Sequence, residues 1–134
     1  DPKEASGQYR KLISDYFGKD EWRFDLVLLG LGNNSHTASL FPHTAVLHDT
    51  IPSVAAVFLK DEGVYRITMN APLINQAHRI VFLVYGKSKA IAVHHVIEEE
   101  YDADHFPAQL IVPQHEALQW FLDAAAASEL RKSV

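Results

Sequence analysis

The feature that most constrains the fold of this chain is an apolar run that stops at a glycine, FDLVLLG at residues 24–30. The run is too short for a typical helix, and nearly all of its residues are apolar, which is typical of a strand covered on both faces. Strands buried in this way belong to parallel sheets. The run therefore predicts a parallel sheet, with the residues after Gly30 at its carboxyl edge.

Strand and helix patterns alternate along most of the chain. Asp1 and Glu4 have the spacing of a capping box, which predicts an amphipathic helix over residues 2–17 that Gly18 closes. Its apolar positions predict a buried stripe of Tyr9, Leu12, Ile13, Tyr16 and Phe17. Further strands are expected at 53–59, 64–69 and 79–86, and further helices at 70–77, with Asn70 as cap, and at 87–100. This alternation favours a layered α/β fold in one domain, residues 1–134.

The strands at 53–59 and 64–69 are separated by KDEG, whose Gly63 suits the positive φ of a tight turn. They are expected to pair as a hairpin.

The C-terminal segment 116–132 fits two patterns. It reads either as one long helix or as a strand through Trp120 and Leu122 followed by a helix that Asp123 caps. Local propensity favours the single helix. The large aromatic side chains are expected in the core: Phe82, Tyr85, Trp120 and Phe121.

Composition excludes several classes of function. The chain has 134 residues, 48% of them apolar, which suffices for one packed domain. Its 12 Lys and Arg are outnumbered by 17 acidic residues, so no basic surface for nucleic acid or anionic lipid is expected. It has no cysteine and no apolar run approaching the ~20 residues that span a membrane. A cytoplasmic location fits, and the start at Asp1 without methionine suggests a fragment or a processed product.

His36 is the first candidate for chemistry. It follows the strand that ends at Gly30 and Gly32, and ligands of open α/β folds bind at that edge of the sheet. The stretch HTASLF, residues 36–41, is expected to begin a short helix whose N–H groups and positive dipole end favour an anion. Neutral imidazole is also a competent general base near pH 7. The alternative, in which His36 only caps that helix, stays open.

Two other chemistries find less support in the sequence. The pair of glycines around Leu31 lacks the third glycine of a dinucleotide-binding fingerprint, and no nucleotide cofactor is expected. His94 and His95 point to different faces of the expected helix, and none of the histidines has the spacing of a hydrolytic zinc site. No metal is expected either.

The stretch FDLVLLGLGNNSHTASLFP, residues 24–42, resembles the signature of 6-phosphogluconolactonases, Gly-x-Gly-x-Asp-Gly-His-Thr-Ala-Ser-Leu-Phe-Pro. The resemblance continues, in the order of that family, through YRITMNAPLINQA, VFLVYGKSKA, FPA and WFLDAAAASEL. It implies a Rossmann-like layered, mostly parallel sheet with helices on both faces, shared with glucosamine-6-phosphate deaminases. It also places Trp120 on a strand and Asp123 at the start of the last helix.

The resemblance implies a reaction and the residues for it. The reaction is hydrolysis of 6-phospho-D-glucono-1,5-lactone to 6-phosphogluconate in the pentose phosphate pathway, with His36 as general base on water. The small-molecule sugar-phosphate lactone is the expected partner, and the expected substrate-binding and phosphate-binding residues are Lys89, Arg66, Gly32, Asn34 and Asn75.

From the residues alone, each of the binding roles has a plainer alternative. Lys89 also fits an ordinary solvated lysine, Arg66 a cross-strand partner, and Asn75 the cap of a turn.

Two departures from the family pattern bear on activity. Asn34 and Ser35 stand where the family has Asp and Gly, so a neutral amide replaces a carboxylate that would stabilise an imidazolium. The chain also resembles only the C-terminal half of the family and lacks the Ser-Gly-Gly phosphate loop of the other half. The isolated chain is therefore expected to be inactive and to self-associate.

Two alternative functions remain at this stage. One is a noncatalytic module that binds a sugar phosphate. The other is an aminosugar-phosphate deaminase or isomerase, although in those enzymes Ile-Ala-Phe-Asn-Glu-Pro follows the histidine in place of residues 37–42.

Overall fold

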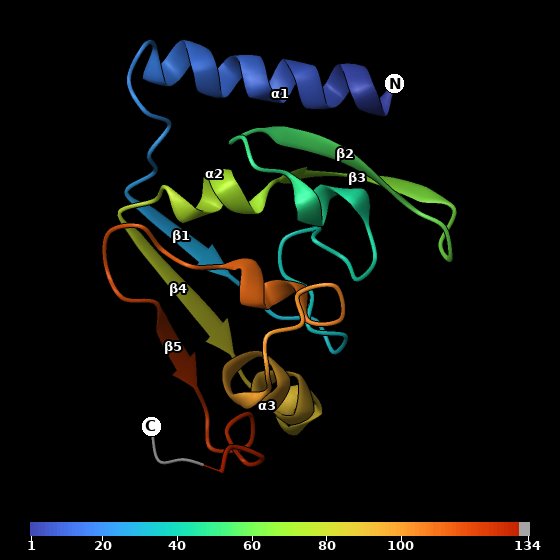
Figure 1. The fold of residues 1–134 in the computed structure, drawn as a ribbon, viewed down its shortest axis with the longest axis vertical. Helices are drawn as coiled ribbons and strands as arrows, with labels where there is room; N and C mark the ends of the chain where they lie inside the picture. Colours follow the sequence, from blue (N-terminus) through green and yellow to red (C-terminus); the bar gives the residue numbers. More distant parts are fainter. Residues whose placement is uncertain (132–134) are drawn as a thin grey trace.

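The computed structural model describes residues 1–131, which form two sheets with helices packed around them (Figure 1). The helices are α1 (Pro2–Phe17), α2 (Ala71–Asn75) and α3 (Ala90–Glu98), and the 3-10 helices are η1 (Ala45–His48), η2 (Lys87–Lys89) and η3 (Pro107–Leu110). The strands are β1 (Leu26–Leu29), β2 (Val54–Leu59), β3 (Val64–Met69), β4 (Arg79–Val84) and β5 (Gln119–Leu122). The predicted α/β class is confirmed. None of the described helices has the length and apolar character needed to cross a membrane.

The main sheet is parallel, with strand order β1-β4-β5. Leu29 of β1 lies opposite Phe82 of β4, and Val84 of β4 lies opposite Leu122 of β5. The three strands therefore end at the same edge of the sheet, and the segments that follow them begin there (Figure 1). This edge carries the loop after Gly30, the turn that leads to α3, and Asp123.

The predicted hairpin is also confirmed. β2 and β3 pair antiparallel, and Gly63 has φ of 65° in the turn between them. The hairpin runs directly into α2, where the Asn70 side chain caps the helix by accepting from the Leu73 N–H at 3.0 Å. Asn70 also accepts from the Ser53 N–H at 3.0 Å, so one buried amide joins the start of β2 to the end of β3.

Helix α1 has its predicted bounds but not its predicted burial. The Asp1 side chain accepts from the N–H groups of Lys3 (2.8 Å) and Glu4 (3.4 Å), and the Gly18 N–H donates to the Ser14 carbonyl at the other end. The helix packs on β2 and β3, yet of its predicted apolar stripe only Ile13 is buried and Phe17 is half-buried. The prediction was wrong for three residues that face solvent: Tyr9, Leu12 and Tyr16.

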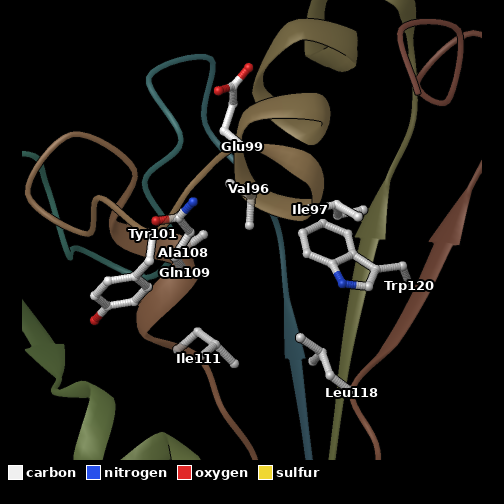
Figure 2. A pocket seen from close by; sticks show the side chains of 9 residues that line it. All are labelled: Val96, Ile97, Glu99, Tyr101, Ala108, Gln109, Ile111, Leu118 and Trp120. Carbon is white, nitrogen blue, oxygen red and sulfur yellow. The ribbon is translucent and has the colours of Figure 1, made fainter. Parts of the chain in front are cut away.

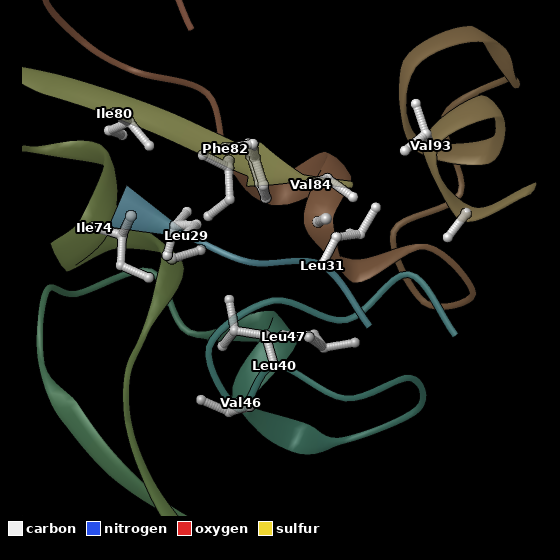
Figure 3. Packing of buried hydrophobic residues seen from close by; sticks show 14 of the residues in the cluster. Leu29, Leu31, Leu40, Val46, Leu47, Ile74, Ile80, Phe82, Val84 and Val93 are labelled. Carbon is white, nitrogen blue, oxygen red and sulfur yellow. The ribbon is translucent and has the colours of Figure 1, made fainter. Parts of the chain in front are cut away.

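One face of the parallel sheet carries the core (Figure 3). Leu29, Ile80, Phe82 and Val84 point from β1 and β4 into a cluster that includes Leu40 and Leu47 of the loop after β1. The alternate side chains on the other face are largely exposed, at 50% for Leu26, 57% for Leu28, 45% for Leu83 and 58% for Phe121. The expectation that β1 is covered on both faces was therefore wrong for the described residues, since none of their helices shields these side chains.

The C-terminal segment follows the strand alternative. Trp120 and Leu122 lie on β5, and the Trp120 ring stacks on Phe82 with centroids 4.0 Å apart. The single helix that propensity favoured was wrong, because pairing with β4 satisfies the backbone of residues 119–122. After β5, residues 124–129 form turns rather than the expected helix, and Asp123 caps them by accepting from the Ala126 N–H at 2.8 Å. Residue 132, in the predicted helix, lies outside the described residues.

Two further predictions on burial fail near the same end of the molecule. Phe121 and Tyr85, expected in the core, are exposed.

Helix α3 ends at Glu98, before the predicted residue 100. The Glu98 side chain accepts from the Arg131 N–H at 2.7 Å and lies 3.1 Å from His94 Nδ1, so it links α3 to the C-terminal segment.

Candidate active site

The loop after β1 is closed on itself by its own backbone. The Gly32 N–H donates to the His36 carbonyl at 2.8 Å, and the Ser35 N–H donates to the Gly32 carbonyl at 2.9 Å. The Thr37 hydroxyl reaches back to the Gly30 carbonyl at 2.8 Å. Ser35, at the position of the family's glycine, is buried and has φ of 64°, the left-handed region that glycine adopts most easily. These bonds hold His36 at the carboxyl edge of the sheet, as predicted.

The helix expected to begin at His36 does not form. Thr37 and Leu40 form an isolated antiparallel bridge instead, and Ala38 between them has φ of 50°, which no α-helix contains. Residues 36–41 therefore supply no helix dipole at His36. The turn is fastened to the hairpin, because the Ser39 N–H donates to the Thr68 hydroxyl of β3 at 3.1 Å.

The His36 imidazole packs against a glycine and an aromatic ring. A Cβ atom placed on Gly32 would lie 2.0 Å from His36 Nδ1 and 2.1 Å from Cε1, so only glycine leaves room for the ring. The Phe41 ring stacks on the imidazole with centroids 4.1 Å apart and planes 18° apart. The Asn34 side chain holds the edge of the ring, with its Oδ1 2.5 Å from His36 Nδ1. The imidazole is thus fixed in both position and orientation.

Burial and neighbouring charges favour the neutral form of this imidazole. Partial burial lowers the pKa of His36 most, and the positive charge of Lys89 and then that of Arg66 lower it further. The negative charge of Glu62 opposes them. His36 therefore stays neutral, and able to accept a proton, at lower pH than a free histidine.

The two predicted cations, whose charges lower the pKa of His36, lie on different elements. Lys89 ends η2 and directly precedes α3, where it is half-buried, and no carboxylate of residues 1–131 forms an ion pair with it. Arg66 lies on β3, and its Nη2 is 3.2 Å from Glu62 Oε2. The ion pair runs along the hairpin rather than across the strands, since Arg66 lies opposite Val57. Lys89 is the freer of the two to meet an anion.

Asn75 lies in a different part of the structure. Its Nδ2 donates to the Leu110 carbonyl at 2.9 Å, and its Oδ1 accepts from the Val112 N–H at 2.9 Å. Both ends of the amide are therefore engaged with the segment between η3 and β5. This arrangement gives Asn75 a clear structural role, and its substrate-binding role stays a prediction.

Two features of the site escaped prediction. Phe41 stacks on the base, and Glu62 pairs with Arg66 and acts on the charge of His36. Phe41 stands within the quoted signature, five residues after His36, which is the one sequence signal that pointed to it. Glu62 lies in a polar turn and gives no such signal.

A cavity of about 330 Å³ lies apart from His36, between α3, η3 and β5 (Figure 2). Its walls are mainly apolar, with Val96 and Ile97 of α3, Ile111 after η3, and Leu118 and Trp120 at β5. The candidate base does not line it. The candidate site is therefore the loop that holds His36 and not this cavity.

The chain is similar to known proteins of one family. The chain is similar to a 6-phosphogluconolactonase of Synechocystis sp., with 40% identity over 98% of this chain and 55% of that protein. It is similar to the human 6-phosphogluconolactonase, with 34% identity over 93% of this chain and 49% of that protein. The chain thus spans about half the length of the curated relatives it matches.

Solved structures show the same fold. A 6-phosphogluconolactonase from Trypanosoma cruzi superposes with a TM-score of 0.82 at 24% identity, over 98% of this chain and 53% of that chain. A monomeric glucosamine-6-phosphate deaminase superposes with a TM-score of 0.68 at 28% identity, over 94% of this chain and 54% of that chain. The family described as glucosamine-6-phosphate isomerases/6-phosphogluconolactonase matches residues 1–120. On the sequence match and the shared fold together, this chain belongs to the glucosamine-6-phosphate isomerase/6-phosphogluconolactonase family.

Proposed function

We propose that this chain carries the catalytic base of a 6-phosphogluconolactonase, which hydrolyses 6-phospho-D-glucono-1,5-lactone to 6-phosphogluconate. The observation that carries the proposal is the imidazole of His36, which packs against Gly32 and Phe41 and whose pKa is lowered by burial and by the charge of Lys89. The relatives named 6-phosphogluconolactonase support the choice of substrate.

The reaction follows from general acid–base chemistry. His36 takes a proton from water as the water oxygen bonds to the lactone carbonyl carbon, and the carbonyl oxygen becomes anionic. The bond between that carbon and the ring oxygen then breaks, and the ring oxygen takes the proton back from the imidazolium. Lys89 and Arg66 hold the phosphate and, by their positive charge, keep His36 neutral before the attack. No metal or organic cofactor enters these steps.

Asn34 makes the alternative functions worth testing in the same assay. A neutral amide at this position supports the imidazolium less than a carboxylate does, which would suit a module that binds without turnover. The similarity to a deaminase gives the second alternative.

The complete gene product is given 6-phosphogluconolactone or glucosamine 6-phosphate, and acid release and ammonia release are measured. We expect acid release above the spontaneous rate; ammonia release alone, or tight binding with neither product, would reject the proposal.

Lys89→Ala tests the phosphate site. Loss of one charge-assisted hydrogen bond, worth about 1.5–3 kcal/mol, should reduce kcat/KM for 6-phosphogluconolactone by about ten- to a hundredfold. The unphosphorylated lactone should lose far less. Lys87→Ala is the matched control, because Lys87 is an exposed lysine of the same 3-10 helix. Equal losses for the two lactones would identify Lys89 as a structural residue.

Gly32→Ala tests the seat of the imidazole. The new Cβ cannot share space with His36 Nδ1, only 2.0 Å away, so the ring must shift by about an ångström, which is enough to lower kcat by roughly 10²-fold. Gly30→Ala is the control, since a Cβ there meets nothing within 4 Å. Circular dichroism checks that both variants fold. Equal kcat in the two variants would show that the ring position does not matter.

A further inference from the structure

The hydrogen bonds of Asn34 determine which nitrogen of His36 carries the proton. The Asn34 side-chain oxygen faces both the His36 backbone N–H, at 3.3 Å, and the His36 Nδ1, at 2.5 Å. A backbone N–H can only donate, so the atom that faces it must be the amide oxygen and not the amide nitrogen. That oxygen can only accept. Nδ1 must therefore be the donor in the second contact.

We propose that Asn34 is the positioning residue that holds neutral His36 in its Nδ1–H form, with Nε2 unprotonated and free to take the proton from water. This inference rests on the proposed function and adds which nitrogen acts and what selects it. Gly32 and Phe41 pack against the ring, and neither offers a side-chain hydrogen bond that would select a tautomer. Within residues 1–131, the hydrogen bond with Asn34 is the only side-chain hydrogen bond that the His36 ring makes.

The neutral amide has a second consequence. It orients the ring without adding negative charge, so the charged groups that act on His36 are Lys89, Arg66 and Glu62. A carboxylate at residue 34 would accept the same hydrogen bond and would also favour the imidazolium. Asn34→Asp therefore separates the two effects, since it keeps the tautomer and changes the charge.

Nitrogen NMR on residues 1–134 measures the tautomer without any need for turnover. In the unsubstituted chain above the titration midpoint of His36, the shift of Nδ1 should be that of a protonated nitrogen and the shift of Nε2 that of an unprotonated one. Asn34→Ala should change the tautomer ratio about two- to tenfold towards Nε2–H, the range that one lost hydrogen bond gives. The predominance of Nε2–H in the unsubstituted chain, or an unchanged ratio in Asn34→Ala, would overturn the proposal.

The titration of His36 provides the second readout. Asn34→Asp should raise its midpoint by about one to three pH units and leave the Nδ1–H form in place. Asn33→Asp is the matched control, because Asn33 is the exposed neighbour and forms no hydrogen bond with the ring among the described residues. In this variant the His36 midpoint should move by less than half as much. Equal shifts in the two aspartate variants would overturn the role of Asn34.

The acid limb of kcat/KM in the complete gene product should move upward with the His36 midpoint in Asn34→Asp. These measurements distinguish the two ideas. Normal lactone turnover with an Nε2–H ring would reject the inference and leave the proposed function, whereas an Nδ1–H ring in a protein without turnover would reject the function alone.

Discussion

Replacing His36 with glutamine is expected to lower kcat for 6-phosphogluconolactone by about 10²–10⁴-fold in the complete gene product, the range that a positioned general base contributes. Glutamine offers a polar group of similar size, but it cannot accept a proton from water near neutral pH. KM should change little, because Lys89 and Arg66, the proposed phosphate-binding residues, are unaltered.

The control for this variant is His115→Gln, which removes an exposed histidine from the loop before β5. Initial rates are compared after subtraction of the spontaneous hydrolysis of the lactone. A His36→Gln protein with near-normal kcat would remove His36 from the role of base, and a loss of equal size in His115→Gln would point to a general effect on folding.

Residues 1–134 on their own are expected to show no lactone hydrolysis above the spontaneous rate and to self-associate. The free face of the parallel sheet exposes Leu26 and Leu28 of β1 and the paired residues Leu83 of β4 and Phe121 of β5, and such apolar surfaces promote association. Turnover also needs the base and the phosphate held together to within about an ångström. This chain offers Lys89 and Arg66 for that task, while its relatives are nearly twice as long.

Light scattering and the lactone assay on the purified chain test both parts of this prediction. Leu28→Lys combined with Phe121→Lys places two charges on the exposed face and should restore a monomer, whereas lysines at the exposed polar residues Gln8 and Ser128 should not. A monomeric unsubstituted chain would refute the association, and a kcat near the enzyme median of ~10 s⁻¹ would refute the inactivity.

The elements that local sequence determines were predicted well. The cap at Asp1, the cap at Asn70 and the turn at Gly63 each depend on side chains within a few residues, and each appears as expected. The burial of whole faces was predicted wrongly, because it depends on what packs against them. Leu28 has the pattern of a doubly covered strand and is exposed, and Tyr16 belongs to an apolar stripe that meets solvent.

In the candidate site too, the features that local sequence determines were predicted and those that depend on the folded loop were not. The signature places His36 at the carboxyl edge of β1, and the structure agrees. The helix expected at residues 36–41 is missing because Ala38 takes a positive φ, which apolar periodicity does not reveal. The role of Gly32 as the space for the imidazole also depends on the closed loop, since residues 32 and 36 meet only after it forms.

The pH dependence of kcat/KM in the unsubstituted protein and in His36→Gln tests most directly whether His36 is the base. Burial and the charge of Lys89 lower the pKa of His36 below the ordinary value of 6.5. A base at His36 therefore stays unprotonated and active to a lower pH than an ordinary histidine would. The unsubstituted protein should therefore show an acid limb with its midpoint below pH 6.5, and the residual activity of His36→Gln should lack that limb. The same acid limb in both proteins would show that another group, and not His36, is the base.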